Sequence, residues 1–384
     1  MKLTPFLKKH YSESFDSIYI DPESEGSQVA LRLIQEFPEK IKPFEDRKKV
    51  KAQTLSPEDF DQSKREVLVQ PHKGKFFKQC PGGNVNSACC NYFVLNLGSQ
   101  CHFNCSYCYL QSFLNTPFMV IYSNIDQAIS ELIDVAKGME NHNIRVGTGE
   151  IIDSLGLDPL TGYTETLLKA LKNAPNVNLE LKTKSHFVDH LLDLDHKRQV
   201  TISWSINPQE VVEREEHGTA SLCERLDAAK MCVDKGYSIG FHIDPVIWHE
   251  DWESNYKELV KEISDRFEPK HVPYISLGAL RFQTEQAAMM KERFSRGSLV
   301  NSGEMFKSKD GKLRYDSRLR SHMFKTIIDE FKSYSRAWKV FLCMEAPETW
   351  LSTYGAFPKK VDGLDDLFVP KPKVETIKKS SEII

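Results

Sequence analysis

Cys101, Cys105 and Cys108 lie within eight residues of one another, in the stretch SQCHFNCSYCYL (99–110). A structural zinc ion normally takes four protein ligands, commonly as two C-x2-C pairs, and a catalytic zinc takes histidine or carboxylate ligands as well. An iron–sulfur cube normally takes four cysteines. Three cysteines in a C-x3-C-x2-C run would therefore leave one iron of a cube open to a ligand that is not protein.

Two other interpretations of the three thiols stay open. The chain has nine cysteines, and clustered thiols in a reducing compartment indicate metal binding or catalysis more than disulfides. The three could be ordinary buried core residues, although their tyrosine and asparagine neighbours argue against this. They could also form half of a zinc knuckle completed by Cys89 and Cys90, or a zinc-binding nucleic-acid module that includes Cys80.

The chain after the cysteines alternates between strand-like and helix-like segments. We expect strands at 90–97, 144–149, 177–184, 199–207, 237–247 and 274–282, and helices at 124–139 (with Asn124 as N-cap), 164–174, 219–236 and 254–267. Six such units in about 200 residues predict a parallel sheet with helical crossovers. Because a closed barrel needs eight units, we expect an α/β fold with an open, partial (β/α)6 barrel.

The segments on either side of this pattern are expected to form extensions. Residues 1–88 have little strand signal and are predicted to form an N-terminal extension of helices and loops, ahead of the barrel at 89–285. A C-terminal α+β extension is expected over 286–370, with a hairpin or turn at 308–317, a helix at 321–335 and a strand at 338–344. The basic tail, 371–384, is expected to be flexible.

Composition limits the classes of function. The chain has 384 residues, of which 27% are charged and 40% hydrophobic, as in an ordinary globular protein. Its formal net charge is −3, so binding of a polyanion would need a local basic patch. The N-terminus lacks the apolar run of a signal peptide, and no stretch approaches the ~20 apolar residues of a membrane span. We expect a cytoplasmic protein with no membrane partner.

The cysteine run after the first strand of a partial barrel, with an aromatic residue before the last cysteine, resembles the radical S-adenosylmethionine (SAM) superfamily. Four further segments resemble the spore photoproduct lyase family, whose members repair a thymine dimer formed by ultraviolet light. They are CSYCYLQS (105–112), KTKSHFVDHLL (182–192), SWSINPQEVVEREEHGTASLCERLDAAK (203–230) and GYSIGFHIDPVIWHEDWESNYKEL (236–259). The resemblance covers roughly residues 90–282.

This resemblance implies two cofactors and the residues that hold them. Cys101, Cys105 and Cys108 would bind a [4Fe–4S] cluster, and the open iron would bind SAM. Lys184 would pair with the SAM carboxylate, because a buried lysine needs an anionic partner. The other implied SAM-binding residues lie at the ends of predicted strands, where α/β sheets place their sites; they are Gly147, Thr148, Gly149, Glu150, Ser205 and Asn207. The reductant would be a protein of the flavodoxin or ferredoxin type.

The resemblance also implies a radical relay, but one member of it is missing. Tyr107 and Tyr109 match the family tyrosines that return the radical to SAM. The family's hydrogen-donating cysteine follows its second strand, where this chain has Glu150, and a carboxylate has no weak bond to hydrogen that it could donate. Cys343 is the main candidate for a replacement. Cys89 or Cys90, direct donation by Tyr109, or a reaction without a separate donor are the alternatives.

The implied substrate is damaged DNA. Candidates for the basic surface that it needs are HKGKFFK (72–78), Arg281 and KSKDGKLRYDSRLR (307–320), whose predicted hairpin could act as a wedge that separates the damaged bases. The function expected from the resemblance is therefore repair of an ultraviolet-induced thymine dimer. A radical SAM enzyme of the same lineage with another nucleotide, RNA or a peptide as substrate is the second hypothesis, which the missing cysteine favours.

Overall fold

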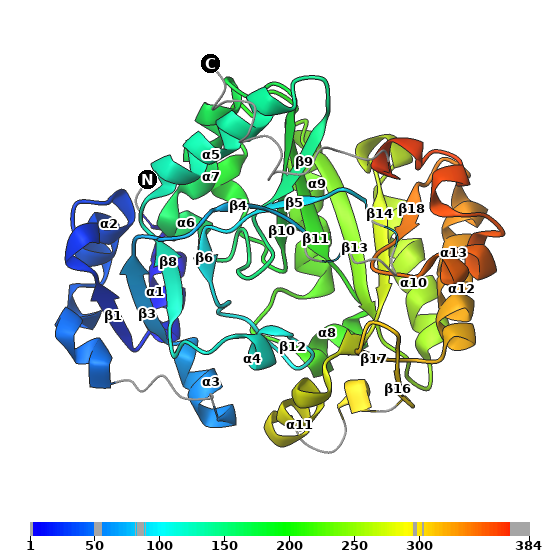
Figure 1. The fold of residues 1–384 in the computed structure, drawn as a ribbon, viewed down its shortest axis with the longest axis horizontal. Helices are drawn as coiled ribbons and strands as arrows, with labels where there is room; N and C mark the ends of the chain where they lie inside the picture. Colours follow the sequence, from blue (N-terminus) through cyan, green and yellow to red (C-terminus); the bar gives the residue numbers. More distant parts are fainter. Residues whose placement is uncertain are drawn as a thin grey trace.

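The centre of the fold is an eight-stranded sheet. The computed structural model describes residues 3–49, 56–80, 82, 88, 90–294, 298–301 and 303–368. The sheet has the order β18-β14-β13-β11-β10-β9-β5-β4, in which only β4 is antiparallel to its neighbour. The strands are β4 (Phe77–Gln79), β5 (Phe93–Leu95), β9 (Ile144–Gly147), β10 (Val177–Thr183), β11 (Val200–Ser205), β13 (Ser238–Val246), β14 (Ile275–Ala279) and β18 (Val340–Leu342). The sheet curls around the middle of the molecule (Figure 1).

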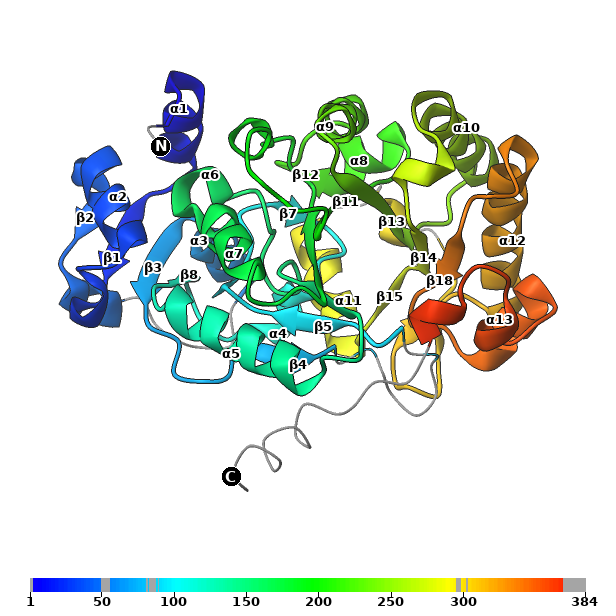
Figure 2. The same ribbon diagram turned by 90° about the horizontal axis from the view of Figure 1, so that it is seen from above.

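Helices cover the outer side of this sheet (Figures 1 and 2). They include α5 (Ile125–Gly138), α7 (Tyr163–Leu171), α9 (Leu222–Asp234) and α10 (Trp252–Arg266), and two short helices, α6 (Asp158–Thr161) and α8 (Gln209–Glu215). A capping box between Ser221 and Glu224 starts α9, and the chain leaves it through Gly236 at φ 84°. The six expected strands and four expected helices are therefore present. Asn124 is the N-cap residue of α5, as expected, but its side chain makes no capping hydrogen bond and instead bonds both the N–H and the carbonyl of His72.

Alternation along the strands separates an apolar outer face from a polar interior. Leu179, Leu181, Ile202, Trp204 and Phe241 belong to the main apolar core. The residues between them face the inside of the half barrel, because successive strand residues point to opposite faces. One interior contact, between Glu180 and His242 at 2.7 Å, joins β10 to β13. The interior of the half barrel is therefore the place where polar chemistry can gather.

The N-terminal extension differs from the expectation, because it contains strands as well as helices. Alongside α1 (Pro5–Ser14), α2 (Gln28–Glu36) and α3 (Pro57–Ser63), a second sheet has the order β2-β1-β3-β8-β6. Its strands are β1 (Ser17–Ile20), β2 (Ile41–Lys42), β3 (Glu66–Gln70), β8 (Met119–Tyr122) and β6 (Gly98–Ser99). The first three are too short to show a period in the sequence. β1 pairs with β2 and β3, and β3 alone of the three pairs with β8, which lies beyond residue 88. The domain boundaries remain a prediction.

The C-terminal extension contains the expected hairpin, helix and strand. β15 (Arg281–Phe282), β16 (Phe306–Lys307) and β17 (Leu313–Arg314) form a small antiparallel sheet, and α11 (Thr284–Arg293), α12 (Ser317–Tyr334) and α13 (Pro347–Tyr354) complete the region. Gly311 turns the hairpin at φ 82°, a conformation that glycine adopts at little cost. The tail at 371–384 lies outside the described residues. Among the described helices, none is long and apolar enough to cross a membrane.

Candidate active site

The cysteine loop, residues 100–108, is held against the segment that follows the strand β11. A two-stranded bridge pairs β7 (Asn104–Cys105) with β12 (Glu216–His217), so that Cys105 lies opposite Glu216. The N–H of Ser106 also donates to the carbonyl of Glu215 at 2.8 Å. After the loop, the chain enters the short helix α4 (Leu110–Phe113). The three thiols therefore lie at the carboxyl ends of the barrel strands, as the sequence predicted.

A lysine from the N-terminal extension holds the cysteine loop from the other side. The ammonium of Lys64 donates to the carbonyls of Cys101 and Phe103, at 2.8 and 2.7 Å. Burial lowers the pKa of Lys64, while Cys108, Cys101 and Cys105 act in the opposite direction, which places the ammonium within electrostatic reach of all three thiols. No motif in the sequence pointed to Lys64, because its partners are backbone carbonyls almost forty residues away.

The donor set of three thiols on one loop suits an iron–sulfur cube, in which each thiolate binds a different iron. In the part of the chain that the structure describes, no three His, Cys, Asp or Glu side chains converge on one point where an ion could sit. Burial raises the pKa of Cys101 to about 12, so the thiol is neutral until a metal displaces its proton. Lys64 and Lys184 lie near enough to offset the thiolate charges.

The zinc alternative receives no support from the remaining cysteines. Cys89 lies outside the described residues. Cys80 and Cys90 are both electrostatic neighbours of Cys343, on the strand end of β18. The zinc knuckle therefore remains a prediction without an observed donor set.

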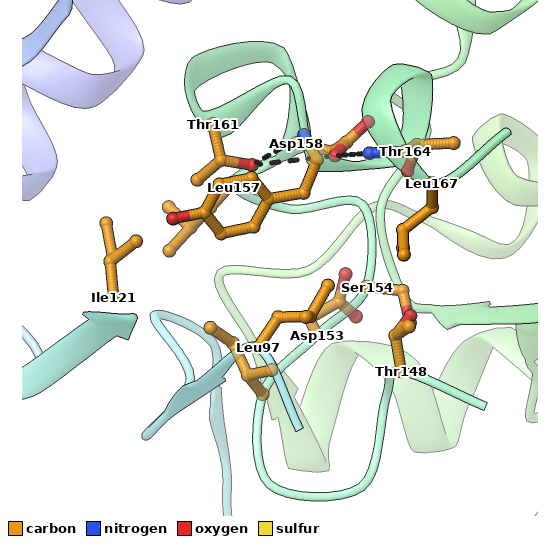
Figure 3. Close-up of a pocket in the computed structure, with 12 residues that line it drawn as sticks. Leu97, Ile121, Thr148, Asp153, Ser154, Leu157, Asp158, Thr161, Thr164 and Leu167 are labelled. Atoms are coloured by element: carbon orange, nitrogen blue, oxygen red, sulfur yellow. Dashed lines mark hydrogen bonds between the residues drawn. The ribbon is translucent and has the colours of Figure 1, made fainter. Parts of the chain in front are cut away.

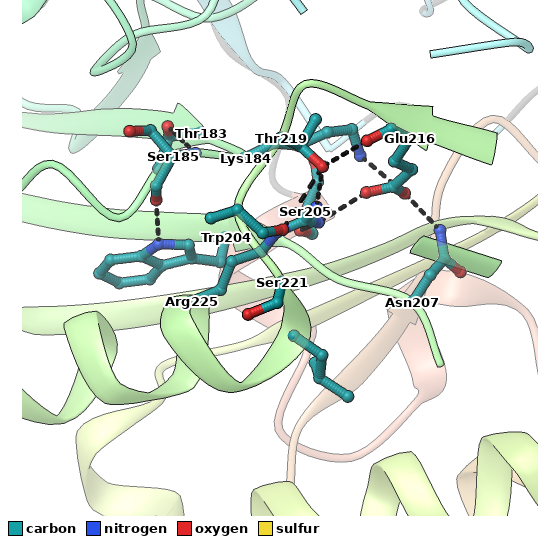
Figure 4. Close-up of polar contacts among 12 residues, drawn as sticks. Thr183, Lys184, Ser185, Trp204, Ser205, Asn207, Glu216, Thr219, Ser221 and Arg225 are labelled. Atoms are coloured by element: carbon teal, nitrogen blue, oxygen red, sulfur yellow. Dashed lines mark hydrogen bonds and ion pairs between the residues drawn. The ribbon is translucent and has the colours of Figure 1, made fainter. Parts of the chain in front are cut away.

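Lys184 belongs to a buried network centred on Glu216 (Figure 4). Glu216 accepts hydrogen bonds from the Lys184 ammonium at 3.2 Å, from the Asn207 amide at 3.0 Å and from the Tyr107 hydroxyl. Arg225 pairs with its second oxygen at 2.6 Å. Burial alone would raise the pKa of Glu216, but Lys184 and Arg225 outweigh it and hold the pKa at about 2. Glu216 is therefore a buried anion that fixes three of the predicted site residues.

Glu216 and Arg225 were not identified from the sequence. Lys184 was expected to face SAM, and in the structure its ammonium is bonded to Glu216. Glu216 begins the two-residue strand β12 directly after α8, and Arg225 lies inside the helix α9, where a charged residue normally faces solvent. Arg225 is instead fully buried and also donates to the carbonyl of Ser205 at 2.8 Å. Both residues lie in the run EEHGTASLCER (215–225), but their spacing matches no motif that would have identified them as site residues.

The predicted glycine turn is tightly packed by the protein itself. A Cβ on Gly147 would lie 1.7 Å from the Tyr92 hydroxyl, and one on Gly149 would lie 2.7 Å from the carbonyl of Lys182. Thr148 is buried and donates to the Ser154 hydroxyl at 2.8 Å. Glycine is therefore required at both positions because other parts of the chain lie too close for a side chain. On the sequence alone, these glycines were expected to allow close approach by SAM.

Glu150 and Tyr109 lie together at the end of this turn. The Tyr109 hydroxyl donates to the carbonyl of Glu150 at 3.0 Å, and the Asn96 amide donates to the Glu150 carboxylate at 3.2 Å. Tyr109 is 41% exposed. Tyr107, two residues earlier, is partly buried, and its hydroxyl donates to the carboxylate of Glu216. The two tyrosines therefore face different surroundings, one open and one closed.

Asp153 anchors the loop between the glycine turn and α6. Its carboxylate accepts from the Thr183 hydroxyl at 2.7 Å and from the N–H of Lys184 at 2.8 Å. Burial raises the pKa of Asp153, and these hydrogen bonds act against that rise. A cavity of about 30 Å³ lies beside it, lined by Thr148, Ser154 and apolar side chains (Figure 3). That volume suits a water molecule and is far too small for a nucleoside.

Cys343 lies inside the half barrel, at the end of β18. Its N–H donates to the carbonyl of Leu277 at 2.6 Å. Burial raises its pKa, so that the group stays a neutral thiol, and Asp244 and Arg281 are its nearest charged neighbours. Cys80 is an electrostatic neighbour of both Cys343 and Tyr109. The structure thus assembles Lys184, Tyr107, Asn207 and the three closely spaced cysteines at one place, and Cys343 at another part of the same interior.

Comparison with protein-family models shows which family this chain belongs to. A family model described as spore photoproduct lyase matches residues 58–331. The chain belongs to the spore photoproduct lyase family. Relatives named spore photoproduct lyase include those of Geobacillus sp. (strain Y412MC61), 27% identical over 54% of this chain, and Bacillus subtilis (strain 168), 29% identical over 44%. The matched parts span 62% and 50% of those two relatives' own length.

Solved structures of spore photoproduct lyase share this fold. One, complexed with dinucleoside spore photoproduct, has a TM-score of 0.74 and 22% identity, and the match covers 85% of this chain and 98% of that chain. A mutant form with bound AdoMet and dinucleoside spore photoproduct has a TM-score of 0.73 at the same identity and coverage. The expected partial-barrel α/β fold is therefore confirmed.

Proposed function

We propose that this protein is a radical SAM enzyme that repairs an ultraviolet-induced thymine dimer in DNA. The observation that carries the proposal is the loop of three cysteines beside the Lys184–Glu216 network, in a chain of the spore photoproduct lyase family. The relatives' names and the ligands in the similar structures give the substrate class.

Cys101, Cys105 and Cys108 would hold a [4Fe–4S] cluster, and Lys184 would form part of the SAM site. A reduced cluster with bound SAM would supply methionine and a 5′-deoxyadenosyl radical. The Lys184 ammonium stays oriented by Glu216 and faces the ring of Tyr107 at 5.6 Å. The remaining proposed SAM-binding residues are Gly147, Thr148, Gly149, Glu150, Ser205 and Asn207.

The substrate would enter from the side on which Tyr109 is exposed. Of the basic stretches predicted to bind DNA, 72–78 has three exposed lysines, Lys73, Lys75 and Lys78. In 307–320, Arg314 and Arg320 are buried in ion pairs, so that Lys307, Lys309 and Arg318 remain at the surface. This surface, and not the buried arginines, would attract the phosphate backbone. A reductant of the flavodoxin or ferredoxin type and a cytoplasmic location remain part of the proposal.

A second candidate is a radical SAM reaction of the same lineage on another nucleotide, RNA or a peptide. The observation that favours it is Glu150, which is fixed by Asn96 where the family has its donor cysteine. The two candidates share the cluster and SAM and differ in the product that follows.

Anaerobic reconstitution with iron and sulfide, followed by dithionite and SAM, tests the proposal. We expect brown protein that releases 5′-deoxyadenosine, and that converts an added dinucleotide photoproduct into the repaired thymidine dinucleotide. Cys105→Ala should lower 5′-deoxyadenosine formation at least a hundredfold, because one iron loses its ligand, whereas Cys223→Ala, on the exposed face of α9, should leave it unchanged. A colourless zinc protein that leaves SAM intact would contradict the class. Release of 5′-deoxyadenosine without formation of the repaired dinucleotide would favour the second candidate.

A further inference from the structure

One layer of the barrel interior gathers charged side chains, three of them positive, from four parts of the chain. Lys182 points inward from β10, two residues before Lys184, and Asp244 comes from β13. Arg281 begins β15, and Lys312 lies in the hairpin just before β17. Lys182 is an electrostatic neighbour of Asp244, and Lys312 of both Arg281 and Asp244. The hairpin therefore closes over the same layer that the barrel strands build.

Every carboxylate of this layer already has a guanidinium partner. Arg281 donates to both oxygens of Asp244, at 2.9 and 3.1 Å. Asp310 holds Arg314 at 2.6 Å, and Glu345 holds Arg320 at 3.1 Å. A Cβ on Gly278 would lie 2.5 Å from Asp244, so the missing side chain at 278 leaves the room that this carboxylate occupies.

The two lysines are left without an anion. Among the described residues, neither the Lys182 nor the Lys312 ammonium forms an ion pair or a hydrogen bond, although both side chains are partly buried. Burial and then Arg281 lower the pKa of Lys312, and Arg314 adds to this, whereas Asp310 and Asp244 act in the opposite direction. His242, the other titratable neighbour of Lys182, is held by Glu180 at 2.7 Å. The layer therefore has a surplus of positive charge that an anion would offset.

We propose that Lys182, Lys312 and Arg281 form a phosphate subsite that binds the phosphodiester joining the two nucleosides of the lesion. This inference rests on the proposed function. A base carbonyl is neutral and would not offset two lysines. The SAM carboxylate belongs to Lys184, roughly 7 Å further along the strand. Cys343 has Arg281 as an electrostatic neighbour, so a phosphate held here places the link between the two bases beside that thiol.

Binding of two matched lesions by the reconstituted enzyme with SAM tests the subsite. One is the dinucleoside photoproduct without phosphate, and the other is the same lesion with its phosphodiester. We expect the phosphodiester to bind about tenfold more tightly or better, as charged hydrogen bonds to phosphate allow, and the advantage to shrink as salt rises. In a Lys182→Gln/Lys312→Gln variant both lesions should bind equally. Lys182→Arg/Lys312→Arg should keep the preference.

Lys257→Gln/Lys261→Gln is the matched control, because both lysines are exposed on α10 and each pairs with a carboxylate of its own helix. It should keep the full preference. Equal binding of the two lesions by the unaltered enzyme, or an unchanged preference in the Lys→Gln double variant, would overturn the subsite and leave the proposed function intact. If the enzyme bound neither lesion while still releasing 5′-deoxyadenosine, the substrate assignment and the subsite would both fall.

Discussion

At the scale of single residues, the proposed function leaves the hydrogen donor to be assigned. Glu150, whose carboxylate is bonded to Asn96, lies where the family resemblance places the donor cysteine. Cys343 is a partly buried thiol, and burial raises its pKa, so that it stays protonated. Under the proposed function, the Cys343 thiol would give a hydrogen atom to a thymine radical: its S–H bond would break, a C–H bond would form, and the thiyl radical would regain hydrogen through Tyr109 and finally 5′-deoxyadenosine.

Replacement of this thiol gives the residue-scale prediction. In D2O the Cys343 thiol exchanges its proton, so the repaired thymidine dinucleotide formed by the unaltered enzyme should carry deuterium. Cys343→Ala should lower both the yield of repaired dinucleotide and its deuterium content about tenfold or more, as measured by mass spectrometry, while lesion is still consumed to by-products. Cys223→Ala, far from the interior on α9, is the control. Unchanged deuterium content in Cys343→Ala would point to Cys90 or Tyr109 instead.

At the scale of elements, the β16–β17 hairpin combines an exposed aromatic ring with exposed cations. Phe306 is 54% exposed, and Lys307 and Lys309 lie beside it at the surface. The hairpin lies at the same end of the barrel as α4 and β12, which hold the cysteine loop (Figure 1). An aromatic ring next to lysines is suited to stack on a base while the cations follow the backbone.

We therefore expect Phe306→Ala to weaken binding of lesion-containing DNA without affecting the fold. Stacking on one base contributes about 1–3 kcal/mol, so the dissociation constant should rise roughly tenfold, measured by fluorescence anisotropy. The thermal unfolding midpoint should stay the same, because the ring is mostly exposed. Phe357→Ala removes a ring of similar exposure (48%) from another part of the chain and should leave DNA affinity unchanged. Equal affinities of all three proteins would exclude a wedge role.

At the scale of the whole molecule, all three regions of the chain hold the cysteine loop. The N-terminal extension contributes Lys64, and the barrel contributes the bridge between Cys105 and Glu216. The C-terminal extension contributes Arg293 from α11, which donates to Gln111 at 2.6 Å and to Asn104. The extensions are therefore part of the site and do more than wrap the barrel.

Lys64→Met tests this coupling. The change keeps the length of the side chain but leaves the carbonyls of Cys101 and Phe103 without a donor, and each unsatisfied buried group costs about 1–3 kcal/mol. We expect a free energy of unfolding lower by about 2 kcal/mol in urea and a clear loss of iron bound after reconstitution. Lys42→Met, exposed in the same extension, should change neither. Full iron binding by Lys64→Met would show that the barrel holds the loop alone.

The sequence by itself determined the barrel and supplied the candidate cluster ligands. The period-2 and 3.6-residue patterns are local, so β10, β11 and α9 could be placed to within a few residues. Cys101, Cys105 and Cys108 could be proposed as ligands because a metal site made from one loop leaves its spacing in the sequence. The hairpin at Gly311 was found for the same reason.

The tertiary structure alone decided which side chains meet across the fold. Glu216, Arg225 and Lys64 had no recognisable motif, since each acts on a partner that is distant in sequence or belongs to the backbone. The strands β1, β2 and β3 were missed because strands of two to five residues show no period and become strands only when they pair. Lys184, proposed to bind SAM, also has a protein partner in Glu216, because burial obliges a charge to find a counterion wherever the fold places one.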